Sequence, residues 1–269
     1  MIDHPEVVAG VARLPARAGR LAVAIGVFDG LHRGHRHLLR RLVRQAAAWR
    51  ARAAVITFDH HPDEVIRGSA PPLLLDPEER LWRLGREGVE IVVVEHFDER
   101  LRSTPYDAFV RGIAGRIDLA GFVMTPDAAF GFERRGTPAA VAELGRSGRL
   151  RYEVAIARPL IVDGRAISSS AIRSAIADGD LAEARRLLGR SHAVVGDPDD
   201  GGLRFGMPVA LPPDGSYRAT VAAFPAARRR SRGLDARATV ERGSIRIDRI
   251  VAGARLRVAF PGSGVSEVV

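Results

Sequence analysis

Residues 21–41, LAVAIGVFDGLHRGHRHLLRR, place a strand, a turn and a helix in immediate succession. The apolar run at 21–27 predicts a buried strand. Apolar side chains then recur with the spacing of one helix face, at Leu38, Leu39, Leu42, Val43, Ala46 and Trp49. The turn at 28–35 therefore lies where a buried strand passes into an amphipathic helix, which is the beginning of a βα unit.

That turn has the features of an anion-binding site. The first turn of a helix carries unpaired N–H groups and a partial positive charge. Gly26, Gly30 and Gly34 allow the backbone to approach a bulky ligand. His32 and His35, three residues apart, lie on one helix face, and each can donate a hydrogen bond to a phosphate oxygen. We prefer a phosphate-binding turn to the alternative, a pair of surface histidines.

Strands and helices continue to alternate after this unit. Further strands are predicted at 53–58, 91–94, 121–124 and 151–157, and helices at 76–86 (Asp76 as N-cap, Pro77 first), 105–113 (Thr104 as cap), 138–144, 171–177 and 181–188. Such alternation predicts an α/β fold, a Rossmann-like domain built on a parallel sheet. Loops at the carboxyl edge of such a sheet form the ligand crevice. We expect His32, His35, His61, Asp127 and Ser168 to converge there.

Residues 167–173, ISSSAIR, form a second candidate phosphate site. Ser168, Ser169 and Ser170 are good helix caps, and their hydroxyls and the following amides can bind phosphate. Arg173 on the first turn can hold phosphate oxygens in bidentate fashion. Alone, the segment is equally typical of a capped helix. Two helix N-termini at one crevice would hold a triphosphate from two sides.

The chain changes character near residue 193, where Gly and Pro become frequent. Short alternating runs at 217–224, 244–247 and 256–260 predict a small antiparallel β-barrel or sandwich. The charge run Arg228, Arg229, Arg230 and Arg232 is predicted to be a solvated loop. We therefore predict two domains, residues 1–192 and 193–269.

Composition excludes several kinds of chemistry. All 41 basic residues are Arg, so the chain has neither a P-loop lysine nor a Schiff-base lysine, and it contains no Asn and no Cys. A net charge of +9 suits nucleotides, whereas no aromatic-interleaved basic stripe favours nucleic acid. No apolar run is long enough for a membrane span, and the N-terminus does not have the pattern of a signal peptide. We expect a cytoplasmic protein without nucleic-acid or membrane partners; its oligomeric state is not predicted.

The segment 26–35, G-x-F-D-G-x-H-x-G-H, resembles the signature of FAD synthetases, a branch of the nucleotidyltransferase superfamily that is usually fused to riboflavin kinase. Residues 167–173 resemble the family's I-S-S-T-x-I-R, and Thr57-Phe58-x-x-His61-Pro62 resembles its T-F-x-P-H-P, with His60 where Pro is usual. F-D at 97–98, F-V at 109–110, G-D at 179–180 and L-L-G-R at 187–190 match further stretches. The resemblance covers about residues 21–192.

The resemblance implies transfer of AMP from ATP to FMN with Mg²⁺ bridging the phosphates and with few protein ligands for the metal. It implies catalytic roles for His32, His35 and Arg173. The implied nucleotide-binding residues are Gly26, Phe28, Asp29, Gly30, Gly34, Ser168, Ser169 and Ser170, and the implied flavin-binding residues are Phe58, His61, Pro62, Asp127 and Phe130. No protein metal site is assigned, and a metal pair of His60 and His61 is disfavoured against packing in the loop.

Two departures from the family pattern leave alternatives open. In the family's G-x-D-F-x-F-G, this chain has Thr125 and Ala128 in place of Gly and Phe, which removes a stacking ring worth about 1 kcal/mol. The kinase motif G-F-P-T-A-N is replaced by Gly206-Met-Pro-Val-Ala-Leu211, without its Thr and Asn. We therefore expect a remnant kinase-like barrel that does not phosphorylate riboflavin. The alternatives are a different phosphorylated acceptor, or a non-catalytic flavin- or nucleotide-binding protein.

Overall fold

The computed structural model describes residues 4–147, 150–200, 202–225, 233–249, 252 and 254–262. The chain divides into two compact units. The first comprises the chain up to Phe28 with Gly34–Pro71 and Arg80–Ala166; the second comprises Asp29–Arg33, Pro72–Glu79 and the chain from Ile167 onward. The second unit thus includes two short segments from the N-terminal half of the sequence. The predicted domain boundary at residue 192 stays a prediction.

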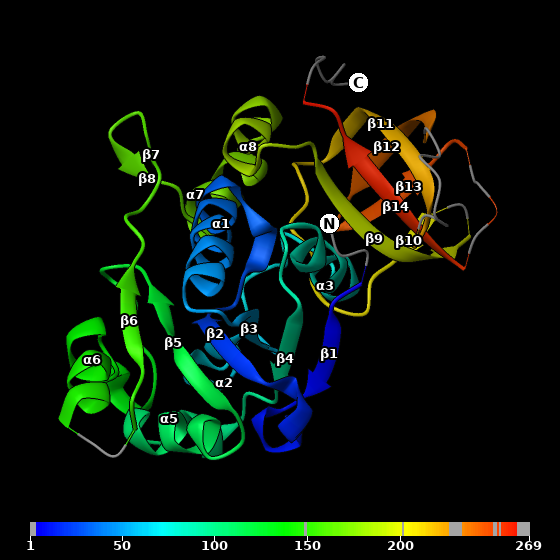
Figure 1. Cartoon of the computed structure of the whole chain (residues 1–269). Helices are drawn as coiled ribbons and strands as arrows, with labels where there is room; N and C mark the ends of the chain where they lie inside the picture. The colour runs from blue at the N-terminus through cyan, green and yellow to red at the C-terminus, as the bar shows by residue number, and fades with distance from the viewer. Residues whose placement is uncertain are drawn as a thin grey trace. The chain divides into compact units, whose positions relative to one another are not determined.

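The first unit is built on a six-stranded parallel sheet, which confirms the predicted Rossmann-like α/β fold (Figure 1). Its strands lie in the order β1-β4-β3-β2-β5-β6. They are β1 Glu6–Ala9, β2 Arg20–Ile25, β3 Arg52–Phe58, β4 Ile91–Glu95, β5 Asp118–Met124 and β6 Glu153–Ile156. The strand order reverses at β2, so the loops after β2 and β5 leave the sheet at its topological switch point.

The helices connecting these strands are α1 Arg33–Ala48, α2 Pro62–Arg67, α3 Pro77–Arg86, α4 Glu99–Arg102, α5 Tyr106–Ala114 and α6 Pro138–Ser147. The predicted apolar face of α1 is buried at Leu39, Leu42 and Ala46. Asp76 accepts the amides of Glu78 and Glu79, as expected of the cap of α3. The prediction of Thr104 as the cap of α5 was wrong, because Pro105 occupies the N-cap and the Thr104 hydroxyl donates to the Arg100 carbonyl.

The second unit contains a closed antiparallel barrel (Figure 1). A barrel was one of the two β architectures predicted, the other being a sandwich. The barrel order is β10-β13-β12-β11-β14-β9. Its elements are α7 Ser169–Ala177, α8 Leu181–Leu188, β9 His192–Asp199, β10 Gly202–Arg204, β11 Gly215–Phe224, β12 Leu234–Glu241, β13 Ser244–Ile247 and β14 Arg255–Phe260. A small hairpin of β7 Ile161–Val162 and β8 Arg165–Ala166 precedes Ile167.

Each unit has its own apolar core. Sheet residues such as Val23, Ile56 and Phe122 pack with Val110 and Ile113 of α5 in the first unit. The barrel is filled by side chains such as Val221, Leu256 and Phe260. The predicted charge run at 228–232 lies outside the described residues. Within the described part of the chain, every helix is too short or too polar to cross a bilayer.

Candidate active site

The turn after β2 has an unusual backbone. Phe28 and Leu31 have φ values of 53° and 38°, and Gly30 has a φ of 78°. Such values are rare for non-glycine residues and are kept where surrounding packing holds them. Phe28 is buried, and its ring meets the edge of the His35 ring at a centroid distance of 5.3 Å. A Cβ on Gly30 would lie 3.0 Å from Leu74 Cδ1, so this position also accepts no larger residue without displacement.

Asp29 connects this turn with the start of α7. The carboxylate is 3% exposed; it accepts the Leu74 amide at 3.0 Å and the Arg173 Nη2 at 2.5 Å. The Ser169 hydroxyl donates to the Asp29 carbonyl at 3.0 Å. All of these residues belong to the second unit. The two sequence signatures, 140 residues apart, are therefore joined by direct contacts of one aspartate.

Two nitrogens of the Arg173 guanidinium donate hydrogen bonds that hold the side chain in place, and the third donates none among the described residues. Its Nε donates to the Pro72 carbonyl at 2.8 Å, and Nη2 donates to Asp29. Its side chain is 16% exposed. Among the described residues no bond uses Nη1, so N–H donors remain for a phosphate.

The three serines have different surroundings. Ser168 is the N-cap of α7, and its Oγ accepts the Ala171 amide at 3.2 Å. Ser169 is the first helical residue and is committed to the Asp29 carbonyl, while Ser170 is exposed. The helix thus begins two residues before the predicted start at 171. A phosphate at this end would meet the Ser170 hydroxyl and the amides of the first turn.

The two histidines of the turn differ in burial. His32 is 4% exposed, and burial, assisted by the positive charge of Arg190, lowers its pKa to about 4. It is therefore neutral at physiological pH and would meet a phosphate as an N–H donor rather than as a cation. His35 is partly buried on the first turn of α1 beside Phe28.

The predicted flavin residues after β3 are organised around the start of α2. The Phe58 ring contacts the Phe97 ring edge-on at 5.2 Å. His61 is the N-cap of α2, with Nδ1 accepting the Asp63 amide at 3.2 Å, and Pro62 is its first residue. Their roles toward a flavin stay predictions.

The predicted flavin residues after β5 point in different directions. Asp127 is exposed, whereas Phe130 packs against Phe109 and Phe122 with both ring centroids 6.0 Å away. Ala128 packs against the same core. Gly131, with φ 75°, lies so close to Tyr106 that a Cβ would come within 2.6 Å of its backbone.

The residues predicted to converge are divided between the two units. Asp29–Arg33, which contains His32, and the start of α7 share the second unit, while His35, His61 and Asp127 belong to the first. The convergence of all five predicted residues stays a prediction. Two features were missed from sequence: the Asp29–Arg173 ion pair, which no local pattern encodes, and a cluster of Asp59, His60 and His96. The second follows from the pairing of β3 with β4, since Asp59 and His60 directly follow β3 and His96 directly follows β4.

Comparison with known proteins identifies the family. A profile of the FAD synthetase family matches residues 14–171. The bifunctional riboflavin kinase/FMN adenylyltransferase of Haemophilus influenzae is 31% identical over 194 residues, which cover 70% of this chain and 62% of that protein. This chain belongs to the FAD synthetase family. A putative bifunctional riboflavin kinase/FMN adenylyltransferase of Geobacillus thermodenitrificans is 33% identical over 168 residues, 62% of this chain and 88% of that protein.

The match to the family is partial in length. The aligned region spans about three fifths of several curated relatives, 62%, 61% and 60% of their lengths. Among solved structures, a protein of Streptococcus pneumoniae titled a macrolide-efflux protein has a TM-score of 0.80 and 24% identity, over 100% of this chain and 92% of that one. That likeness shows the fold.

Proposed function

We propose that this member of the FAD synthetase family transfers AMP from ATP to FMN, giving FAD and pyrophosphate, and that it does not phosphorylate riboflavin. The observation that carries the proposal is the set of contacts from Asp29 to Ser169 and Arg173. They join the strand-to-helix turn and the serine-rich helix start, the two segments whose chemistry suits phosphate. Family membership and the names of the relatives support the same reaction.

In the proposed reaction AMP passes directly from ATP to FMN, without a covalent bond to the protein. An oxygen of the FMN phosphate forms a bond to the α-phosphorus of ATP, and the bond to the pyrophosphate oxygen breaks, so that pyrophosphate leaves with its electron pair. Positioning and charge stabilisation dominate such transfers. His32 and His35 would donate N–H groups to phosphate oxygens, while Arg173 and the first turn of α7 would hold the β- and γ-phosphates.

Adenylyl transfer of this kind uses Mg²⁺, and the chain offers a suitable donor. Mg²⁺ prefers oxygen ligands and usually keeps several waters, with one or two carboxylates and the substrate phosphates. Asp127 presents an exposed carboxylate at the carboxyl end of β5, whereas Asp29 is buried against Arg173. Asp127 would therefore hold the ion together with phosphate oxygens. When bound, Mg²⁺ neutralises charge on the phosphates.

A direct assay tests the transfer. Folded protein is incubated with ATP, Mg²⁺ and a wide range of FMN concentrations, and FAD is measured by chromatography. His35→Asn is expected to lower the rate about 10²–10³-fold, by analogy with the loss of one oxyanion donor. His37→Asn, on the same helix, is the matched control and keeps the wild-type rate. No FAD from the wild-type protein at any FMN concentration would refute the proposal.

A different phosphorylated acceptor is the second candidate. It is favoured by Ala128, whose methyl group packs against the core where the family's pattern has a stacking ring. Release of pyrophosphate from ATP with another phosphate ester, but not with FMN, would establish it. A non-catalytic binding protein is distinguished by calorimetry: it would bind ligand without turnover, and His35→Ala would leave the affinity unchanged.

The proposed absence of kinase activity rests on residues 206–211. Val209 and Leu211, at the positions of the kinase Thr and Asn, pack against the barrel core. The Leu73 amide donates to the Pro208 carbonyl and the Ala210 amide donates to the Leu73 carbonyl, so the segment is paired as backbone. Neither side chain offers a ligand for Mg²⁺ or ATP. Riboflavin with ATP and Mg²⁺ is expected to yield no FMN, in a preparation that is active with FMN as acceptor.

A further inference from the structure

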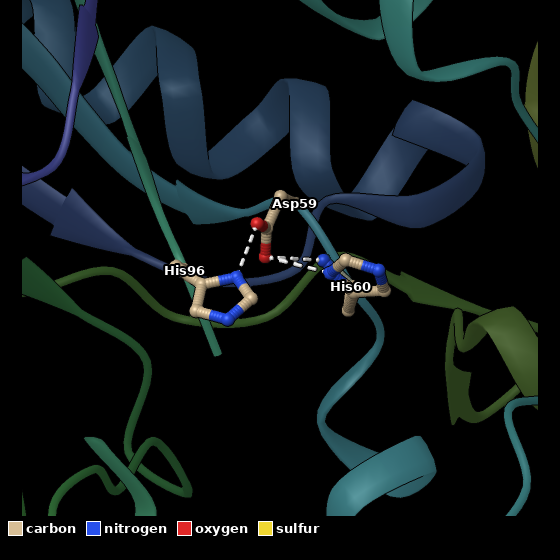
Figure 2. Close-up of side chains that lie close together, drawn as sticks. All are labelled: Asp59, His60 and His96. Atoms are coloured by element: carbon tan, nitrogen blue, oxygen red, sulfur yellow. Dashed lines mark hydrogen bonds and ion pairs between the residues drawn. The ribbon is translucent and has the colours of Figure 1, made fainter. Parts of the chain in front are cut away.

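Three polar side chains meet at the carboxyl ends of two adjacent strands in the first unit (Figure 2). Asp59 and His60 directly follow β3, and His96 directly follows β4, its parallel neighbour. The His96 Nδ1 lies 2.7 Å from Asp59 Oδ2, and the His60 Nδ1 lies 3.1 Å from Asp59 Oδ1. The two rings face the same carboxylate from different loops, with centroids 5.7 Å apart.

The backbone around the cluster is well fixed. The Asp59 amide donates to the Glu95 carbonyl at 3.1 Å, which extends the pairing of β3 and β4 by one residue. Asp59 Oδ1 in turn accepts the amides of His60 and Phe97, at 2.7 and 3.1 Å. The carboxylate is therefore held in place, with two imidazoles turned toward it.

We propose that Asp59, His60 and His96 bind one divalent transition-metal ion of the Zn²⁺ class. Their three ligand atoms lie within 4.8 Å of one another. In a tetrahedral zinc site with bonds of about 2.0–2.1 Å, neighbouring ligand atoms are about 3.3 Å apart. The two nitrogens lie 2.7 and 3.1 Å from different oxygens of the Asp59 carboxylate, so a single ion is bound when both rings turn toward one point beside that carboxylate. The side chains of His60 and His96 are 45% and 65% exposed, so an ion in solvent can reach both imidazoles.

The donor set selects the class of metal. Two imidazole nitrogens and one carboxylate suit Zn²⁺, Co²⁺, Ni²⁺ and Cu²⁺, whereas Mg²⁺ and Ca²⁺ prefer oxygen alone. The ligands of this site therefore differ from the all-oxygen ligands of the Mg²⁺ ion that the proposed adenylyl transfer uses. Three protein ligands leave a fourth position for water or another small ligand, as in open zinc sites. His60 stands where the family's T-F-x-P-H-P has Pro, so the complete ligand set belongs to this chain rather than to that pattern.

The decisive experiment is a titration of the metal-free protein with ZnCl₂, followed by calorimetry, and with CoCl₂, followed by visible absorption. We expect one ion per chain and the intense absorption of tetrahedral Co²⁺. His96→Ala and His60→Ala should each weaken Zn²⁺ binding at least about 10-fold, since loss of a supporting residue alone commonly costs 10–100-fold. His4→Ala, which removes an exposed histidine outside the cluster, should leave the affinity unchanged.

Thermal melts without metal confirm that each variant is folded, and neither readout depends on enzymatic activity. His96 is the best site for substitution, because among the described residues its side chain forms hydrogen bonds to Asp59 alone and is largely exposed. The proposal is overturned if wild-type protein binds no Zn²⁺ up to millimolar concentration, or if His96→Ala binds Zn²⁺ as tightly as wild type.

Discussion

At the scale of single residues, the most informative group is the carboxylate of Asp29. An acid beside a proposed triphosphate site would repel its ligand if it were free. Here it is buried and paired with Arg173, whose Nε is held at the same time by the Pro72 carbonyl. The pair fixes the plane of the guanidinium, which leaves its outer N–H groups in a defined direction. We therefore regard Asp29 as a positioning residue that acts through Arg173.

Asp29→Asn tests that role. Removal of the charge weakens the bond to Arg173 while the shape of the side chain is kept. We expect kcat/KM for ATP to fall about 10–100-fold, as for other partners that orient a binding group, with a larger rise in KM than loss in kcat. Steady-state kinetics of FAD formation measures the split.

The control for this variant is Asp118→Asn, which breaks an exposed pair with Arg20 and should leave the kinetics unchanged. A double-mutant cycle with Arg173→Lys separates positioning from general damage. If Asp29 acts through Arg173, the two losses are strongly non-additive. Additive losses, or a fall in melting temperature that accounts for the lost rate, would contradict the positioning role.

The residue types of the site were predictable from sequence, but their pairing was not. Capping preferences identified the three serines as candidate caps, of which Ser168 is the N-cap, and apolar periodicity identified the turn as the start of α1. These are local effects that act over a few residues. Asp29 and Arg173 are 144 residues apart in the sequence, and their contact depends on the tertiary fold, so no local sequence pattern predicts it. The burial of His32 has the same origin.

At the scale of elements, the loop after β5 is shaped by a close approach of two backbones. Gly131 lies against Tyr106 at the start of α5, and its φ of 75° lies in the left-handed region. Gly68, which ends α2, has nearly the same φ of 77°, but open space lies where its Cβ would be. The two glycines thus share a positive φ, but they differ in ψ, which is 1° at Gly68 and 176° at Gly131, and in their surroundings.

This difference yields a prediction about stability. Gly68→Ala should cost about 1 kcal/mol, the penalty for a side chain in the left-handed region. Gly131→Ala puts a side chain on a backbone conformation that is essentially limited to glycine and adds a clash with the backbone of Tyr106, so it should cost about 3 kcal/mol or more. Urea unfolding followed by circular dichroism measures both. Equal costs for the two variants would mean that the loop moves away from Tyr106 without loss.

The elements themselves were predicted unevenly, for a physical reason. The inner strands β2 to β5 are largely buried, so each reads as a continuous apolar run and was recognised, and the edge strand β6 was recognised as well. Strands β9, β10 and β12 of the barrel were not recognised, because Pro, Gly or charged residues interrupt the apolar pattern of their sequences. The helices α2 and α4 are too short, at six and four residues, for a helical period to show.

At the scale of the whole molecule, two buried histidines link stability to pH. His32 and His192 both belong to the second unit, and each has a pKa of about 4. For His192, burial is the main cause, assisted by Arg190 and Arg257 and only partly offset by its bond to the Ala210 carbonyl at 2.7 Å. Since that carbonyl can only accept, Nε2 carries the proton of the neutral ring, which stacks on Phe260.

The sign of the pH effect follows from the two states. An unfolded histidine binds a proton near pH 6.5, whereas folded His192 resists protonation until about pH 4. The stabilisation is therefore complete above pH 6.5 and is lost as the pH falls toward 4. Each such histidine accounts for about 3 kcal/mol over that interval, and for about 2 kcal/mol between pH 6.5 and 5.

His192→Gln tests this contribution, because an amide can still donate toward the Ala210 carbonyl but does not titrate. The variant is expected to be less stable than wild type at pH 7.5, since its side chain does not stack on Phe260 as an aromatic ring does. Between pH 6.5 and 5, however, its free energy of unfolding should fall by about 2 kcal/mol less than that of wild type. In wild type, His192 binds a proton in the unfolded state but not in the folded state over this range, and the substituted glutamine binds none in either state. Urea titrations at four pH values give both slopes, and His4→Gln, which replaces an exposed histidine, should follow the wild-type slope. Parallel slopes for His192→Gln and wild type would show that protonation of His192 does not govern the acid sensitivity of the fold.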